Sequence, residues 1–187
     1  MSEEKLDQWI FKLVLLGDHA VGKTSLINQY MDKMFEEDYK PTIGVNIIQK
    51  TIELKQIKSN VRLILWDIAW QEKYQKFRQY YFEGCVGALL VYDITRETTF
   101  ENIKSKWYKD FKQYVETKNH TYVLIGNKND LENERCVANN DGKNLADSIG
   151  AVDFIETSAK EGNNVEKAFL RLVQKVLSNQ GVKFDID

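Results

Sequence analysis

The sequence is poor in the residues that mark specialised classes of protein. Its 187 residues include two cysteines, Cys85 and Cys136, and a single proline. Two cysteines are too few for the disulfide framework of a small secreted domain, and they indicate a reduced, intracellular setting. The ten glycines also fall below the usual share of about 7%. The positions that do carry glycine are therefore informative.

Neither sign of charge dominates, and no long apolar run is present. The 26 Lys and Arg residues against 28 Asp and Glu residues leave a net charge of −2, which argues against a nucleic-acid-binding protein. The longest apolar run, 85–92, is well short of the ~20 residues that a transmembrane helix needs. The polar, acidic start of the chain does not resemble a signal peptide. We therefore expect a single cytoplasmic domain of ordinary globular composition.

Short apolar runs alternate with segments of helical periodicity along the chain. This alternation predicts a three-layer α/β domain with a six-stranded, mostly parallel sheet, one antiparallel edge strand and helices on both faces. We expect strands at 10–16, 45–55, 61–66, 86–92, 122–125 and 152–155, and helices at 23–31, 100–115, 141–149 and 165–177. The domain would span 10–178, between an N-terminal extension (1–9) and a tail (179–187). In such folds, ligands bind beyond the carboxyl ends of the strands.

A phosphate-binding motif follows the first predicted strand. Residues 17–24 read GDHAVGKT, which matches G-x-x-x-x-G-K-[ST] between a strand and a helix. Glycines in such a loop let the backbone N–H groups wrap around phosphates, next to a helix N-terminus. Lys23 would reach the β- and γ-phosphates, and the Thr24 hydroxyl would ligate Mg²⁺. This motif alone predicts a nucleoside triphosphate as the ligand.

Two more motifs follow later strands, N-K-x-D at 127–130 and Ser-Ala-Lys at 158–160. Together with the phosphate loop, they resemble the Ras superfamily of small GTPases, most closely the Rab branch, over 10–178. The resemblance implies a P-loop NTPase G domain that binds GTP and GDP with Mg²⁺. A small-molecule kinase with a similar phosphate loop would leave the two later motifs without a purpose.

The resemblance also assigns roles at the guanine base. Asp130 would accept hydrogen bonds from the two guanine N–H groups, which adenine cannot offer. Asn127 and the Ala159 N–H would lie beside the keto oxygen, and the stems of Lys128 and Lys160 would pack on the faces of the ring. The nucleotide-contacting residues implied in this way are Gly17, Ala20, Val21, Gly22, Lys23, Thr24, Ser25, Phe35, Thr42, Trp70, Asn127, Lys128, Asp130, Ser158, Ala159 and Lys160.

Two switch segments are implied as well, switch I around 35–44 and switch II around 67–79. Thr42 would be the second hydroxyl on Mg²⁺, and Asp67 would hold the ion through water. Gln71 would orient the attacking water, with Lys23 stabilising the charge that develops. Effector and exchange-factor proteins would bind these segments. Three apolar residues, Ile43, Val45 and Trp66, either form a hydrophobic patch that binds effectors or are core residues of an edge strand.

The sequence departs from the family in switch II. The family reads D-x-x-G-Q there, whereas residues 67–71 read DIAWQ, so Trp70 replaces a glycine whose N–H contacts the γ-phosphate. A left-handed conformation at this position costs a non-glycine residue ~1–2 kcal/mol. Trp70 either supplies its N–H from an ordinary conformation or impairs hydrolysis and switching.

A second departure lies in the phosphate loop itself. His19 either points into solvent or obstructs an activating arginine beside the γ-phosphate. With Trp70, it predicts slow GTP hydrolysis. The alternative is a nucleotide-binding interaction module in which hydrolysis is negligible.

Two further segments bear on the branch and on membrane association. Residues 101–108 resemble the Rho branch, but only 131–135 separate the base motif from the next helix, which leaves no room for the Rho insert. A packed amphipathic helix is the better explanation of 101–108. No cysteine lies in 181–187, so prenylation is unsupported: the chain either stops before an anchor or a further domain, or is not lipidated. We expect it at endomembranes only if another anchor exists.

Overall fold

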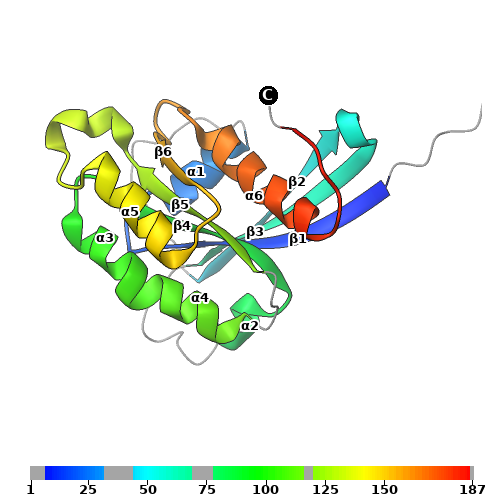
Figure 1. Cartoon of the computed structure of the whole chain (residues 1–187), viewed down its shortest axis with the longest axis horizontal. Helices are drawn as coiled ribbons and strands as arrows, with labels where there is room; N and C mark the ends of the chain where they lie inside the picture. The colour runs from blue at the N-terminus through cyan, green and yellow to red at the C-terminus, as the bar shows by residue number, and fades with distance from the viewer. Residues whose placement is uncertain (1–6, 32–43, 69–77, 116–119, 186–187) are drawn as a thin grey trace, which may run out of the picture.

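The structure is a computed structural model that describes residues 7–31, 44–68, 78–115 and 120–185. A six-stranded sheet with strand order β2-β3-β1-β4-β5-β6 runs through the molecule (Figure 1). Among the described strands, only the β2–β3 pair is antiparallel. The predicted mostly parallel α/β fold is therefore confirmed. The strands are β1 (Asp7–Leu16), β2 (Val45–Leu54), β3 (Ser59–Ile68), β4 (Cys85–Asp93), β5 (Thr121–Asn127) and β6 (Phe154–Thr157).

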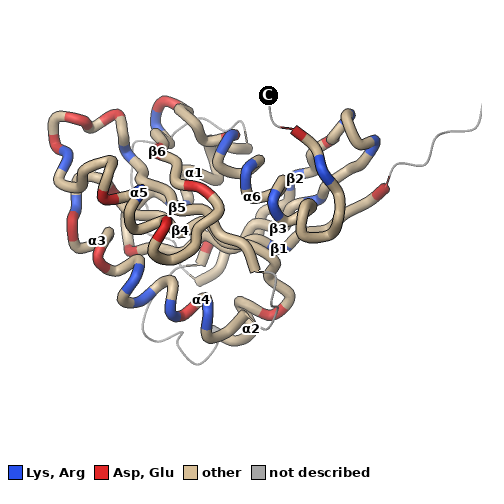
Figure 2. The backbone as a smooth tube through the Cα atoms, in the orientation of Figure 1, with Lys and Arg blue, Asp and Glu red and all other residues tan. Residues whose placement is uncertain are grey.

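Helices cover both faces of the sheet. One apolar cluster packs α1 and α6 against one face, and a second packs α2 to α5 against the other. Charged residues lie on the helices and loops around a largely uncharged centre (Figure 2). Among the described helices, none combines the length and apolar character needed to cross a membrane. The helices are α1 (Lys23–Tyr30), α2 (Arg78–Phe82), α3 (Glu97–Asn102), the π-helical turn η3 (Ile103–Trp107), α4 (Tyr108–Tyr114), α5 (Asn139–Ile149), α6 (Val165–Asn179) and the 3₁₀ turns η1 (Lys55–Ile57) and η4 (Asn129–Glu134).

Several elements differ from the sequence prediction. β1 begins at Asp7, inside the expected N-terminal extension, and α2 (Arg78–Phe82) was not predicted. The helix expected at 100–115 is interrupted by the π-helical turn η3, which joins α3 to α4. The last strand lies at Phe154–Thr157 rather than 152–155. Val152 is 38% exposed, and pairing with β5 begins only where Phe154 lies opposite Leu124. An apolar residue in the loop was therefore mistaken for the start of the strand.

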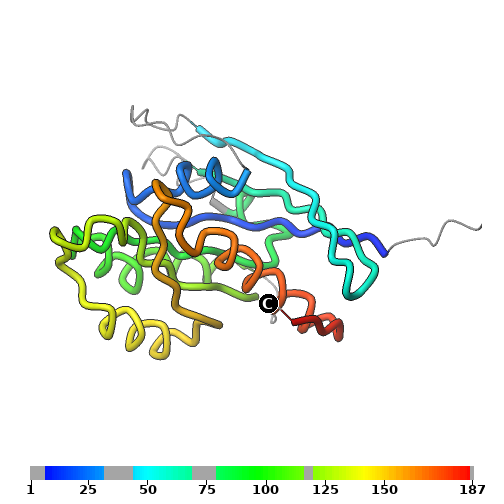
Figure 3. The backbone as a smooth tube through the Cα atoms, turned by 90° about the horizontal axis from the view of Figure 1, so that it is seen from above, coloured from blue at the N-terminus to red at the C-terminus, as the bar shows by residue number. Residues whose placement is uncertain are grey.

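The segment after α6 turns back along the sheet. Val182 and Phe184 pack against the cluster beneath α6. Gln174 Nε2 donates a hydrogen bond to the Phe184 carbonyl at 2.7 Å, and the Asp185 N–H donates to Gln56 Oε1 at 3.3 Å. Figure 3 shows this segment beside the C-terminal end of α6. The tail thus contacts the turn between β2 and β3.

The hydroxyl of Tyr92 lies in the core between two glycines. A Cβ atom at Gly126 or Gly142 would come within 2.8 or 2.7 Å of this oxygen. Burial raises the pKa of Tyr92, and its hydroxyl has no hydrogen-bond partner among the described residues. Because an unsatisfied buried hydroxyl costs about 1–3 kcal/mol, we expect Tyr92→Phe to leave stability unchanged or raise it by about 1 kcal/mol in urea unfolding.

The matched control is Tyr122→Phe. The Tyr122 hydroxyl donates to the Ile149 carbonyl, so its removal should lower the free energy of unfolding by about 1 kcal/mol. A loss of the same size in Tyr92→Phe would show that its hydroxyl is satisfied.

Candidate nucleotide-binding site

The phosphate loop joins the end of β1 to α1, and two of its glycines are required by the backbone. A Cβ atom at Gly17 would lie 2.1 Å from the Val91 carbonyl oxygen. At Gly22 it would lie 2.2 Å from Asn127 Nδ2, and Gly22 also has a φ of +100°. Side chains at either position would push the loop off its neighbours. The predicted loop therefore forms where the motif places it.

Lys23 lies inside this loop, and its ammonium group closes it. Its Nζ donates to the carbonyls of Gly17 and Asp18, both at 2.8 Å. Burial lowers the pKa of Lys23 to about 8, although the nearby carboxylates of Asp67 and Asp18 act to raise it. A partly buried cation held on loop carbonyls favours an anionic ligand that would compensate its charge.

Two side-chain oxygens that could hold a divalent cation lie at the end of the loop. The Thr24 hydroxyl donates to Asp67 Oδ2, and Asp67 is buried at the end of β3. Hydroxyl and carboxylate oxygens are the donors that Mg²⁺ prefers, so this pair fits the predicted metal site. Thr42, the third predicted contact, lies outside the described residues.

Asn127 connects the base motif to the phosphate loop. Its Oδ1 accepts hydrogen bonds from the Thr157 hydroxyl at 2.9 Å and the Ala159 N–H at 3.2 Å. Its Nδ2 donates to the Val21 carbonyl at 2.8 Å. One buried amide thus holds together the ends of β5 and β6 and the phosphate loop.

Asp130 is oriented by the third motif. Its Oδ1 accepts from the Ser158 hydroxyl at 2.6 Å, and Ser158 Oγ accepts in turn from the Glu161 N–H at 3.0 Å. Both side chains of the predicted base pocket are therefore held from the loop after β6. Lys160 lies exposed on the same loop.

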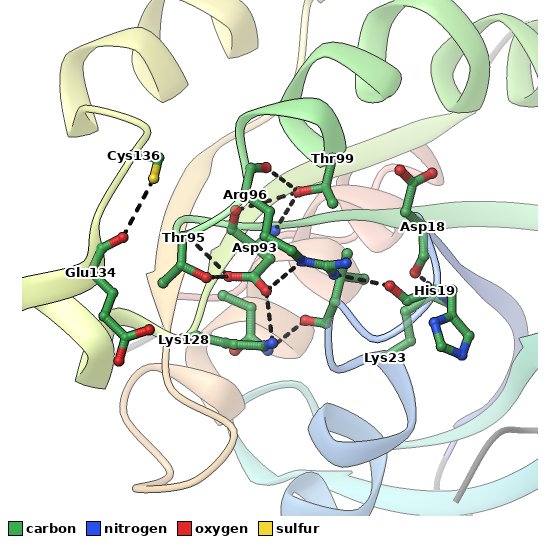
Figure 4. A network of polar contacts seen from close by, with 12 residues as sticks. Asp18, His19, Lys23, Asp93, Thr95, Arg96, Thr99, Lys128, Glu134 and Cys136 are labelled. Carbon is green, nitrogen blue, oxygen red and sulfur yellow. Dashed lines mark hydrogen bonds and ion pairs between the residues drawn. The ribbon is translucent and has the colours of Figure 1, made fainter. Parts of the chain in front are cut away.

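A network that the sequence did not predict surrounds Asp93 at the end of β4 (Figure 4). Asp93 Oδ2 lies 2.7 Å from Lys128 Nζ and 3.0 Å from Arg96 Nε. Burial acts to raise the pKa of Asp93, but hydrogen bonds from Lys128 and Thr95 hold it below its usual value. Arg96 Nη2 also donates to the His19 carbonyl at 2.9 Å. The only sequence signal for this network was an acidic residue at the carboxyl end of a strand.

The structure thus brings the phosphate-loop residues, Thr24 with Asp67, and both base motifs to one edge of the sheet. His19 is exposed there. Phe35, Trp70 and Gln71, like Thr42, lie outside the described residues.

This fold and site define a phosphate-loop nucleotide-binding domain. A sequence model of the Ras family matches residues 12–178. The chain is 43% identical to the Ras-related protein RABA6a of Arabidopsis thaliana over 93% of its own length and 72% of that protein. It is 40% identical to RABA2a of the same plant (98% and 83%) and 38% identical to Rab11D of Nicotiana tabacum (95% and 77%).

The chain therefore belongs to the Ras family, within which it is a Rab-like small GTPase. Ras-family GTPases bind GTP and GDP with Mg²⁺. The phosphate loop with Lys23 suits the phosphates of the nucleotide, and the oxygens of Thr24 and Asp67 suit Mg²⁺.

Proposed function

We propose that this protein is a guanine-nucleotide switch that acts in vesicle trafficking and hydrolyses GTP slowly. The observation that carries the guanine preference is the arrangement of Asp130 and Asn127. Ser158 and Ala159 hold them from one side, and Asn127 reaches across to the phosphate loop at Val21. One rigid unit would thus bind both ends of the nucleotide.

In this proposal, Lys23 exchanges its loop carbonyls for the β- and γ-phosphates. Thr24 would hold Mg²⁺ directly and Asp67 would hold it through water, with Thr42 added in the GTP state, and the ion would neutralise phosphate charge when bound. Gln71 orients a water molecule for in-line attack on the γ-phosphate. Lys23 and the backbone N–H groups of the loop stabilise the charge that develops.

Slow hydrolysis is proposed from Trp70 and His19. Trp70 occupies the position where the family has a glycine that contacts the γ-phosphate. His19 adds a side chain to the loop beside that phosphate, and its carbonyl is held by Arg96. Both would hinder the closing of switch II or the entry of an activating arginine.

Identification of the nucleotide that copurifies with the protein, followed by single-turnover GTP hydrolysis, tests this proposal. We expect a guanine nucleotide, slow turnover, and a roughly tenfold faster rate in Trp70→Gly, which corresponds to the ~1–2 kcal/mol of backbone strain relieved. Equal rates for both proteins, at the level of an active small GTPase, would contradict slow hydrolysis without affecting nucleotide binding.

The same residues favour a second candidate function, an interaction module that binds nucleotide but scarcely hydrolyses it or switches. This candidate predicts that GTP remains intact over hours. It also predicts that Trp70→Gly, and not the wild type, responds to an activating protein.

Effectors would bind the exposed edge formed by β2 and β3. Ile47 lies opposite Trp66 in the β2–β3 pairing, and Ile47 is 50% exposed. Val45 and Trp66 are partly buried against the core, so Ile47, which the sequence did not single out, is the better candidate for contact. Ile43 lies outside the described residues.

The lowered pKa of Lys23 predicts pH-dependent binding. A bound phosphate raises the pKa above its value of about 8 in the free protein, so binding takes up a proton at higher pH. GDP affinity should be constant well below pH 8 and fall above it, by up to roughly tenfold per pH unit. Stability of the nucleotide-free protein has the opposite trend: unfolded lysine titrates near 10.5 and holds more protons, so stability rises between about pH 8 and 10.5.

Lys23→Arg is the control, because arginine stays charged over this range and titration of the nucleotide itself affects both proteins equally. The GDP affinity that Lys23→Arg retains should not show the part of the fall above pH 8 that deprotonation of Lys23 causes. Identical pH profiles for the two proteins would exclude Lys23 as the titrating group.

A further inference from the structure

The chain between β4 and β5 contains a π-helical turn at η3, between α3 and α4. A π turn forms i→i+5 hydrogen bonds and is rare outside single turns within α-helices. It places side chains five residues apart on the same face. On an α-helix, with 3.6 residues per turn, such side chains would be about 140° apart.

Asn102 and Trp107 are five residues apart, and both contact the phosphate loop. Asn102 Nδ2 donates to Asp18 Oδ2 at 2.7 Å, and Trp107 Nε1 donates to Asp18 Oδ1 at 2.8 Å. Trp107 is 1% exposed, so its indole is fixed by packing. Each oxygen of the Asp18 carboxylate thus accepts one hydrogen bond from a residue at one end of the π turn.

This arrangement directs a negative charge away from the place where phosphates would bind. In Figure 4 the Asp18 carboxylate points away from Lys23. The Asp18 carbonyl accepts from Lys23 Nζ, so a change in the orientation of Asp18 would also move the lysine. Arg96, at the N-cap of α3, donates to the His19 carbonyl at 2.9 Å and so holds the next residue of the loop.

We propose that Asn102 and Trp107 are positioning residues for the phosphate loop, and that the π turn exists to bring both onto Asp18. The proposal rests on the proposed nucleotide-binding function. Without the two donors, the Asp18 carboxylate turns toward the bound phosphates and repels them. Nucleotide then dissociates faster.

The first test is a double-mutant cycle on the dissociation rate of fluorescent GDP. Trp107→Phe keeps an aromatic ring but removes the N–H, and should accelerate release about ten- to a hundredfold. In the Asp18→Ala background, the same substitution should have almost no further effect. Tyr108→Phe, which removes one polar atom from the neighbouring ring, is the matched control and should release GDP at the wild-type rate.

Segment length provides the second test. Ser105 is exposed, and among the described residues its hydroxyl donates to the Glu101 carbonyl at 2.9 Å and lies 3.5 Å from Asn102 Oδ1. Deletion of Ser105 places Asn102 and the tryptophan four residues apart. An α-helix then keeps both on one face, so release should stay within about twofold of the wild type. Insertion of one alanine after Ser105 separates them by six residues and should accelerate release as Trp107→Phe does.

Thermal unfolding of each variant separates positioning from packing. If Trp107→Phe lowers the melting temperature but accelerates GDP release equally with and without Asp18, Trp107 acts through packing and the proposal is wrong. If Trp107→Phe does not fold, Asn102→Ala replaces it in the cycle, with the same expectations. A wild-type protein that binds no guanine nucleotide would overturn the proposed function and this proposal together, whereas unchanged release in the variants overturns only the latter.

Discussion

Replacement of Asp130 by alanine is expected to abolish the preference for guanine over adenine nucleotides, by about 10⁴-fold in relative affinity. The carboxylate would accept from both guanine N–H groups, and adenine offers no matching pair. Ser158 holds the carboxylate at 2.6 Å, so little ordering remains to be done when the base binds. Competition between GDP and ADP for a fluorescent nucleotide measures the effect.

Two companion variants make the result specific. Ser158→Ala leaves the carboxylate but removes its hydrogen bond, and should weaken GDP binding only about tenfold. Asp147→Ala removes an exposed carboxylate on α5 and should change nothing. If Asp130→Ala and Asp147→Ala retain the same guanine preference, the base is recognised elsewhere.

Replacement of Gly22 by alanine should destabilise the protein by about 2–5 kcal/mol and abolish nucleotide binding. The φ of +100° at Gly22 costs an alanine ~1–2 kcal/mol. Its Cβ would also lie 2.2 Å from Asn127 Nδ2, and displacement of that buried amide costs about 1–3 kcal/mol. Because Asn127 joins the phosphate loop to the base motif, the loss extends to the whole site. Urea unfolding and GDP titration measure the two effects.

Gly84→Ala separates backbone strain from steric overlap. Gly84 has a φ of +69°, but no atom lies within 4 Å of a Cβ built there. This variant should lose only the ~1–2 kcal/mol of conformational strain and bind GDP as the wild type does. If Gly22→Ala and Gly84→Ala lose the same free energy of unfolding, displacement of the Asn127 amide costs nothing.

The parts of the site that the sequence predicted are those encoded by contiguous residues. The phosphate loop needs particular glycines and a lysine at fixed spacing, and strand–loop–helix context places them. The base motifs follow β5 and β6, whose carboxyl ends meet at one edge of a parallel sheet. Asn127 and the Ala159 N–H were expected on the same side of the base, and in the structure this N–H donates to Asn127 Oδ1 at 3.2 Å.

The parts that were missed depend on residues far apart in the chain. Asp93 meets Lys128, and Asp18 meets Trp107, through the packing of separate elements, for which no local pattern exists. The π turn was missed because Ile103, Trp107, Phe111 and Val115 recur every four residues, a spacing that an α-helix accommodates equally well. The i→i+5 hydrogen bond from the Tyr108 N–H to the Ile103 carbonyl and the side chains bound to Asp18 distinguish the π turn from an α-helix.

The contact of Asp185 with Gln56 determines where a label or support coupled to the tail would lie relative to the nucleotide-binding site. Gln56 belongs to the turn that leads into β3. Ser59, at the start of β3, pairs with Asp7 at the start of β1. Asp67 and the phosphate loop lie at the other end of these two strands. Eight residues of strand, at about 3.3 Å each, separate these ends by roughly 26 Å. A fluorophore or solid support coupled near Asp185 would therefore stand at the opposite end of the strands from the nucleotide-binding edge and leave that edge open to solution.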